Sequence, residues 1–134
     1  MKTSIKLILF IGILFLISCE TNNPPYYKLK GKWVESVQRK DTLLFNYLDS
    51  VGGSFWLNNG LELRNGHMLP KASAGLYDFK FRNDSILLYY GLSSTYNFKP
   101  YYYKLNATFD VLQIGNFYNS GIPNTARMTF VRIN

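Results

Sequence analysis

The sequence contains a single cysteine and a single histidine among its 134 residues. One cysteine excludes an intramolecular disulfide, and one histidine excludes a histidine pair, a three-histidine metal site and a Cys/His dyad. The histidine, His67, lies in Asn65-Gly66-His67-Met68-Leu69-Pro70, which is a turn by composition and indicates an exposed loop residue rather than a catalytic one. We therefore predict that the protein uses no metal and no cofactor.

Patterns typical of enzymes are also missing. The serines lack a G-x-S-x-G elbow, and Gly52-Gly53-Ser54 leads into a strand instead of a helix, which argues against a phosphate cradle. No pair of facing carboxylates is indicated, and four of the eight acidic residues fall in or beside turns or on outward strand positions: Asp49, Asp78, Asp84 and Asp110. We expect a protein that is not an enzyme.

The sequence has no apolar run long enough to span a membrane. Lys2 and Lys6 precede eleven apolar residues, 7–17 (LILFIGILFLI), whereas a spanning helix needs about 20. A short basic segment followed by a short apolar run is typical of a secretion signal. Residues 1–18 are therefore predicted to be a signal peptide.

The only cysteine stands directly after this run. Leu16-Ile17-Ser18-Cys19 resembles the bacterial lipobox. The resemblance implies that the Cys19 thiol receives a diacylglyceryl group, that cleavage occurs before it and that its new amino group is acylated, so that membrane lipid is a partner of the chain. We expect a protein anchored in the bacterial cell envelope, at the outer membrane, facing the periplasm or the cell surface. The alternative is a chance cysteine that closes an ordinary signal or lies in a buried helix.

The remaining chain is mildly basic. Removal of residues 1–18 leaves 116 residues and takes away two lysines, so the formal charge of +7 falls to +5. The charges are scattered, with no basic run of the kind that binds nucleic acid, and we predict no nucleic-acid partner. Thr21-Asn22-Asn23-Pro24-Pro25 is polar and proline-bearing, so residues 19–29 are expected to be a lipidated tether and residues 30–134 a single domain.

No segment after Pro25 shows the 3.6-residue periodicity of a helix, whereas alternation typical of strands is frequent. In residues 76–82 (LYDFKFR), Tyr77, Phe79 and Phe81 fall on one face and charged residues on the other. Asn83-Asp84 then predicts a tight hairpin turn into residues 85–90. The outward charges also argue against a barrel that spans the outer membrane.

Further strand signals complete an all-β pattern. A second hairpin is predicted from residues 101–105 and 108–114, and a third from residues 54–57 and 61–64, linked by Asn58-Asn59-Gly60. Other strands are expected at residues 32–37, 42–47 and 127–133, which makes about nine in all. We predict an antiparallel up-and-down meander that closes into an eight- or nine-stranded barrel, in preference to a sandwich.

The first predicted strand begins with Gly31-Lys32-Trp33, which resembles the G-x-W motif of lipocalins. The layout of residues 31–134 also resembles small lipocalin-like lipoproteins of Bacteroidetes-type bacteria. The resemblance implies that Trp33 closes one end of the barrel and that Arg132, or as a second candidate Arg127, packs across it. The plainer interpretation is a turn glycine and a core tryptophan. Because lipocalins carry a helix after the barrel and this sequence ends at Asn134, a shortened barrel is expected.

The same resemblance implies a small apolar or amphipathic ligand inside the barrel. The candidate lining residues are Trp33, Tyr77, Phe79, Phe81, Tyr101 and Tyr103. The alternative function is that of a structural lipoprotein with a filled barrel, which binds an envelope protein or a glycan through exposed tyrosines or through residues 92–98 or 119–124. Glu35 shares the face of Trp33 and is expected to be either a buried carboxylate at the barrel mouth or the partner of an arginine at the rim.

Overall fold

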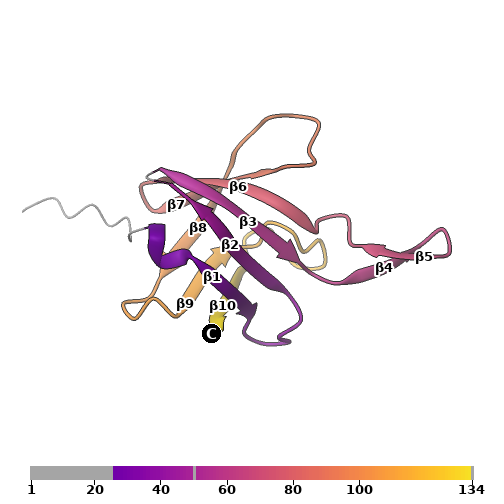
Figure 1. Ribbon diagram of the computed structural model, residues 1–134, viewed down its shortest axis with the longest axis horizontal. Helices are drawn as coiled ribbons and strands as arrows, with labels where there is room; N and C mark the ends of the chain where they lie inside the picture. Colours follow the sequence, from indigo (N-terminus) through magenta and orange to yellow (C-terminus); the bar gives the residue numbers. More distant parts are fainter. Residues whose placement is uncertain (1–25, 50, 134) are drawn as a thin grey trace, which may run out of the picture.

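The computed structural model describes residues 26–49 and 51–133, and it shows a closed barrel of eight antiparallel strands (Figure 1). The all-β, up-and-down meander expected from the sequence is therefore confirmed. The barrel strands are β1 (Gly31–Glu35), β2 (Thr42–Leu48), β3 (Gly52–Asn58), β6 (Gly75–Arg82), β7 (Ser85–Tyr90), β8 (Lys99–Leu105), β9 (Val111–Gly115) and β10 (Arg127–Ile133).

Each barrel strand pairs with the next barrel strand along the chain, and β10 pairs with β1 to close the ring. The one interruption is an arm of two strands, β4 (Leu61–Arg64) and β5 (His67–Pro70), inserted between β3 and β6. The arm projects from the barrel on the side away from the short 3-10 helix η1 (Tyr26–Leu29), as Figure 1 shows. No helix in the described part of the chain is long and apolar enough to cross a membrane.

The hairpin predicted at Asn83-Asp84 is confirmed. β6 and β7 pair from Tyr77 with Tyr90 to Arg82 with Ser85, and Asn83 adopts the positive φ of 54° that a tight turn requires. Tyr77 and Phe79 are buried, Lys80 is exposed, and the alternation along β6 therefore separates the barrel interior from solvent.

The hairpin predicted between residues 54–57 and 61–64 is wrong. Both edges of β3 are occupied, by β2 on one side and β6 on the other, so the chain after Asn58 has no free barrel edge to pair with. Leu61–Arg64 pairs instead with His67–Pro70. His67 thus begins a strand, not a loop, although its side chain is exposed as expected.

The second predicted hairpin forms with a longer connection than expected. β8 and β9 pair, but residues 108–110 belong to the turn because the Asn106 side chain holds it. Asn106 Oδ1 accepts hydrogen bonds from the backbone N–H groups of Asp110 at 3.0 Å and Val111 at 2.9 Å, and Asn106 Nδ2 donates to Thr108 Oγ1 at 2.7 Å. These hydrogen bonds hold residues 108–110 in the turn, so these residues do not join the pairing of β8 with β9.

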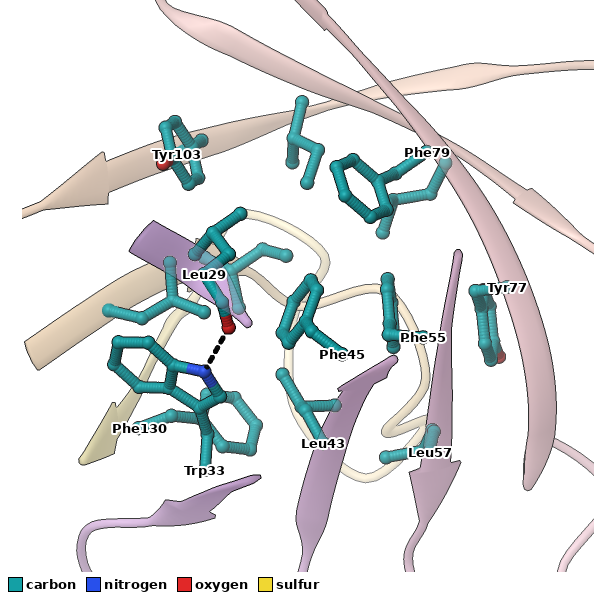
Figure 2. Packing of buried hydrophobic residues seen from close by; sticks show 14 of the residues in the cluster. Leu29, Trp33, Leu43, Phe45, Phe55, Leu57, Tyr77, Phe79, Tyr103 and Phe130 are labelled. Carbon is teal, nitrogen blue, oxygen red and sulfur yellow. Dashed lines mark hydrogen bonds between the residues drawn. The ribbon is translucent and has the colours of Figure 1, made fainter. Parts of the chain in front are cut away.

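The core of the barrel includes Leu29 of η1 and aromatic residues of β2, β3 and β6 (Figure 2). Aromatic rings contact one another there, with 4.8 Å between the ring centroids of Phe45 and Phe55 and 5.5 Å between those of Phe45 and Phe79. Leu29 in η1 is fully buried against this core. The expected tether boundary therefore needs correction, because residues 26–29 belong to the folded domain.

Candidate functional site

The two ends of the barrel differ, and the end that carries η1 is sealed. Trp33 is fully buried and its Nε1 donates a hydrogen bond to Leu29 O at 2.8 Å, drawn as a dashed line in Figure 2. The Cζ atom of Arg132 lies 4.5 Å from the centroid of the Trp33 ring, a cation–π contact. Arg127, the second candidate for that position, lies instead over Tyr102, with 3.9 Å from Cζ to the ring centroid.

The Arg132 guanidinium also ties separate segments together at this end. It donates hydrogen bonds to three backbone carbonyl oxygens, those of Lys28, Lys30 and Phe109. Two of these carbonyls lie in or next to η1, and the third lies in the turn between β8 and β9. The sealed end, tied together in this way, serves as the base of the barrel.

The opposite end holds a cavity of about 700 Å³. In an antiparallel barrel, the start of one strand and the end of the next meet at the same rim, and the cavity lining follows this rule. Asp41 immediately precedes β2, Asn59 follows β3, Ser73 precedes β6, and Tyr90 ends β7. The loop between β9 and β10 contributes Phe117 and Tyr118 to the lining.

Aromatic rings form the apolar part of the cavity wall, with Phe117 at their centre. The Phe117 ring centroid lies 4.9 Å from that of Tyr118, 5.1 Å from that of Tyr77 and 6.1 Å from that of Tyr101. Tyr77 also contacts Tyr90 at 4.9 Å. At these separations the rings pack on one another and present a joint apolar surface to the cavity.

Three of the tyrosine hydroxyls at the cavity already donate their single proton to the protein. Tyr77 donates to Ser73 O at 2.9 Å, Tyr90 to the carbonyls of residues 72 and 74 at 2.9 Å each, and Tyr118 to Asp41 Oδ2 at 2.7 Å. Their oxygen lone pairs are left as acceptors for a ligand. Tyr101 differs, because its hydroxyl has no hydrogen-bond partner in the described part of the chain.

Burial raises the pKa of three of these phenols. Desolvation raises the pKa of Tyr118, and the hydrogen bond to Asp41 raises it further because that carboxylate favours the protonated phenol. Desolvation raises the pKa of Tyr77 and of Tyr101 as well. The aromatic wall therefore carries no charge in the physiological range, and the nearby charges come from Asp41, Glu62 and the lysines at the rim.

A buried amide at the cavity has an unused acceptor. Asn59 is 6% exposed, and its Nδ2 donates to Ser73 Oγ at 2.7 Å. Its Oδ1 has no hydrogen-bond partner within residues 26–49 and 51–133. Buried polar atoms are nearly always paired, so a buried water is the expected partner of this oxygen.

Asn116 shapes the loop that brings Phe117 and Tyr118 to the cavity. This side chain is 2% exposed, and its Nδ2 donates hydrogen bonds to the carbonyl oxygens of Asn119 at 2.7 Å and Ile122 at 3.0 Å. Its Oδ1 accepts a bond from the Asn119 N–H at 2.9 Å. One buried amide thus replaces the missing strand partners of the loop backbone.

The structure divides the predicted lining residues into two groups. Tyr77 and Tyr101 line the cavity. The others lie outside it, because they are further from the open end along their strands: Trp33, Phe79, Phe81 and Tyr103. Alternation along strands identified the inward face, but it carried no information on how far the core extends along the barrel axis.

Several cavity residues were missed by the sequence analysis. Tyr90 could have been found, because the predicted hairpin places it directly opposite Tyr77. Asp41, Asn59, Phe117 and Tyr118 lie in loops, where no periodicity indicates a direction. Only the closed barrel brings these loops to one rim.

The remaining sequence predictions concern acidic groups and metals. Neither expectation for Glu35 is correct, because its carboxylate oxygens accept hydrogen bonds from the N–H groups of Val37 at 2.8 Å and Gln38 at 2.6 Å. It therefore holds the turn after β1. Within the described residues, no group of three or more His, Cys, Asp or Glu side chains is placed to hold a metal ion.

Comparison with known proteins adds no assignment. No protein-family model, no curated protein and no solved structure matches this chain. The features that indicate a function are therefore the cavity, its lining residues and the sequence of the first nineteen residues.

Proposed function

We propose that this protein is a lipid-anchored lipoprotein of the bacterial cell envelope whose barrel binds a small amphipathic ligand without chemical conversion. The observation that carries the proposal is the cavity of about 700 Å³ at the open end of the barrel. Sites for small molecules usually measure about 300–1,000 Å³ and combine an apolar wall with a few polar groups, which describes this cavity.

The lining determines the kind of ligand. The packed rings around Phe117 offer an apolar surface, which favours a hydrocarbon, aromatic or sugar-ring face. The neighbouring polar groups include the carboxylates of Asp41 and Glu62, which accept hydrogen bonds, and the ammonium groups of Lys71 and Lys99, which donate them. The ligand is therefore expected to combine an apolar face with polar groups that both donate and accept hydrogen bonds.

The membrane anchor in this proposal rests on Leu16-Ile17-Ser18-Cys19, which lies outside the described residues. Two or more acyl chains suffice for stable attachment, since each buried CH₂ contributes about 0.8 kcal/mol. η1, the first described element, lies at the sealed end. A lipid on Cys19 would tether the barrel from that end and leave the cavity mouth at the other.

The competing proposal was a filled barrel that acts only through its surface. The sealed half of the barrel is indeed filled, by the cluster around Phe45, Phe55 and Phe79. The cavity lies at the opposite end, where polar and aromatic residues from several loops line a space that side chains do not fill. These observations favour ligand binding.

Native mass spectrometry of the protein purified from its own host membrane tests both parts of the proposal. We expect an N-terminal Cys19 that carries acyl chains, and a small molecule that is released on denaturation. A mature chain that starts elsewhere, or an unmodified thiol, would contradict the anchor. A cavity that yields no ligand from the host and takes up no member of a panel of fatty acids, amines and glycolipids would contradict the binding function.

A pair of tryptophan substitutions makes the binding test specific. Ser120 lies at the rim of the cavity, is exposed and makes no hydrogen bond through its side chain within the described residues, so Ser120→Trp should obstruct the mouth without disturbing the core. Val37 is 85% exposed and lies outside the cavity lining, and Val37→Trp is the matched control. The retained ligand should be lost from the first variant only.

A further inference from the structure

The arm formed by β4 and β5 exposes an apolar face. Leu61 pairs across the arm with Pro70, and Leu63 with Met68, and directly opposed residues share a face. Leu61, Leu63 and Met68 are 55%, 69% and 60% exposed. An isolated two-stranded ribbon is marginally stable in water, whereas three or more strands with an apolar face are stable. The arm has only two strands, so strands added by a partner would stabilise it.

The two edges of the arm, one on β4 and one on β5, differ in their backbone groups. Lys71 N–H donates to Gly60 O at 3.1 Å, so this pair turns its backbone groups toward the opposite strand. The alternation of an antiparallel ladder then directs the backbone groups of Leu61 and Leu63 outward from β4. On β5 the corresponding outward positions are Met68 and Pro70, of which only Met68 has an N–H, so β4 is the better edge for pairing.

The two charged residues of β4 are placed so that two antiparallel copies of this strand would bring opposite charges together. When a strand pairs antiparallel with a copy of itself about Leu63, residue 62 of each copy faces residue 64 of the other. Here these residues are Glu62 and Arg64, so the pairing places two opposite charges across the interface twice. Within one chain, Arg64 Nε lies 3.1 Å from Glu62 Oε1, and the two side chains remain 47% and 39% exposed. Arg64 Nη2 also donates a hydrogen bond to Pro70 O at 2.6 Å, so pairing between copies would exchange these contacts within the chain for contacts between chains.

We propose that two copies of this chain associate through β4, in an antiparallel pairing centred on Leu63 that joins the two arms into a four-stranded sheet. The barrel itself offers no competing edge, because its eight strands close on themselves. Strands of four residues make a small interface, so the association is weak and depends on concentration. Attachment to a common membrane, which rests on the proposed lipidation, would raise the local concentration.

Charge reversal in the full-length lipidated protein tests the pairing. Glu62→Arg and Arg64→Glu each place like charges opposite one another in a homodimer, so self-association should weaken about tenfold in sedimentation measurements in detergent. An equal mixture of the two variants should regain wild-type association, because a copy with two arginines then faces a copy with two glutamates. Failure of the mixture to associate while the wild type does so would overturn the proposed register.

Crosslinking in intact cells gives an independent readout. Leu63→Cys lies on the proposed two-fold axis, where opposed Cα atoms about 5.5 Å apart allow a disulfide. A covalent dimer is expected under mild oxidation, and none from the wild type or from Val37→Cys, a control at an exposed position outside the arm. Crosslinking of Leu63→Cys only to another protein, or no dimer at any concentration, would overturn self-association and leave the cavity proposal unaffected.

Discussion

Arg132 and Trp33 lie directly opposite one another on β10 and β1, and the guanidinium carbon stands 4.5 Å from the centroid of the indole ring. The arginine holds η1 against the barrel through the carbonyls of Lys28 and Lys30, while the indole N–H holds Leu29. The same two residues therefore lie where β10 pairs with β1 and also attach η1 to the end of the barrel. This arrangement makes the sealed end the mechanical base of the cavity at the other end.

Loss of the Arg132 side chain should destabilise the whole barrel. Arg132→Ala removes three hydrogen bonds from a charged donor and the contact with Trp33, and we expect the free energy of unfolding to fall by about 3 kcal/mol in urea denaturation. Arg132→Lys should lose about 2 kcal/mol, because an ammonium cannot reproduce the fork of a guanidinium. Arg127→Ala, which removes an exposed cation–π contact with Tyr102, is the matched control and should cost about 0.5–1 kcal/mol. Equal losses for Arg132→Ala and Arg127→Ala would contradict this role.

Asn116 should determine both stability and ligand binding. Asn116→Asp replaces an NH₂ donor with a carboxylate oxygen that faces the carbonyls of Asn119 and Ile122, so we expect a loss of about 2–3 kcal/mol in unfolding free energy. Because the loop carries Phe117 and Tyr118, retention of the ligand should fall as well. Asn124→Asp, at an exposed position of the same loop, should change stability by less than about 0.5 kcal/mol. Unchanged ligand retention in Asn116→Asp would show that the loop does not form the site.

Features that depend on adjacent residues could be predicted from the sequence, whereas features that depend on distant segments of the chain could not. The hairpin around Asn83 could be predicted because alternation and turn chemistry are both properties of adjacent residues. The partner of β4 could not, since the choice between β3 and β5 depends on β6, which occupies the edge of β3 from further along the chain. Leu61–Arg64 alternates apolar and charged residues in either pairing.

The candidate site shows the same division. Tyr77 was predicted as an inward residue from its strand alone, and it does reach the cavity. Phe117 and Tyr118 were not predicted, because consecutive loop residues both point to the cavity only when Asn116 has fixed the loop backbone. The sequence also did not predict how far the core extends along the barrel. This extent depends on Leu29, which is buried at the sealed end.

The buried tyrosines should make the protein sensitive to alkaline pH. Desolvation raises the pKa of Tyr77, Tyr103 and Tyr118 above the ordinary value of about 10. The folded state then binds more protons than the unfolded state at high pH, so the stabilisation is fully present below about pH 10 and is lost as pH rises above it. Ultraviolet titration should show that part of the 11 tyrosines ionises only when the barrel unfolds. Full ionisation of a barrel that remains folded by circular dichroism would contradict this expectation.

Two tyrosine-to-phenylalanine substitutions should change stability in opposite directions. The Tyr103 hydroxyl is buried without a hydrogen-bond partner among the described residues, so Tyr103→Phe removes an unsatisfied polar atom and should raise the free energy of unfolding by about 1 kcal/mol. Tyr118→Phe removes the bond of 2.7 Å to Asp41 and should lower it by about 1–2 kcal/mol. Both variants delete one oxygen from a ring that is otherwise retained, so each serves as the volume control for the other in parallel urea titrations. A loss of stability in Tyr103→Phe would show that its hydroxyl is satisfied in solution, for which a buried water is the plainest source.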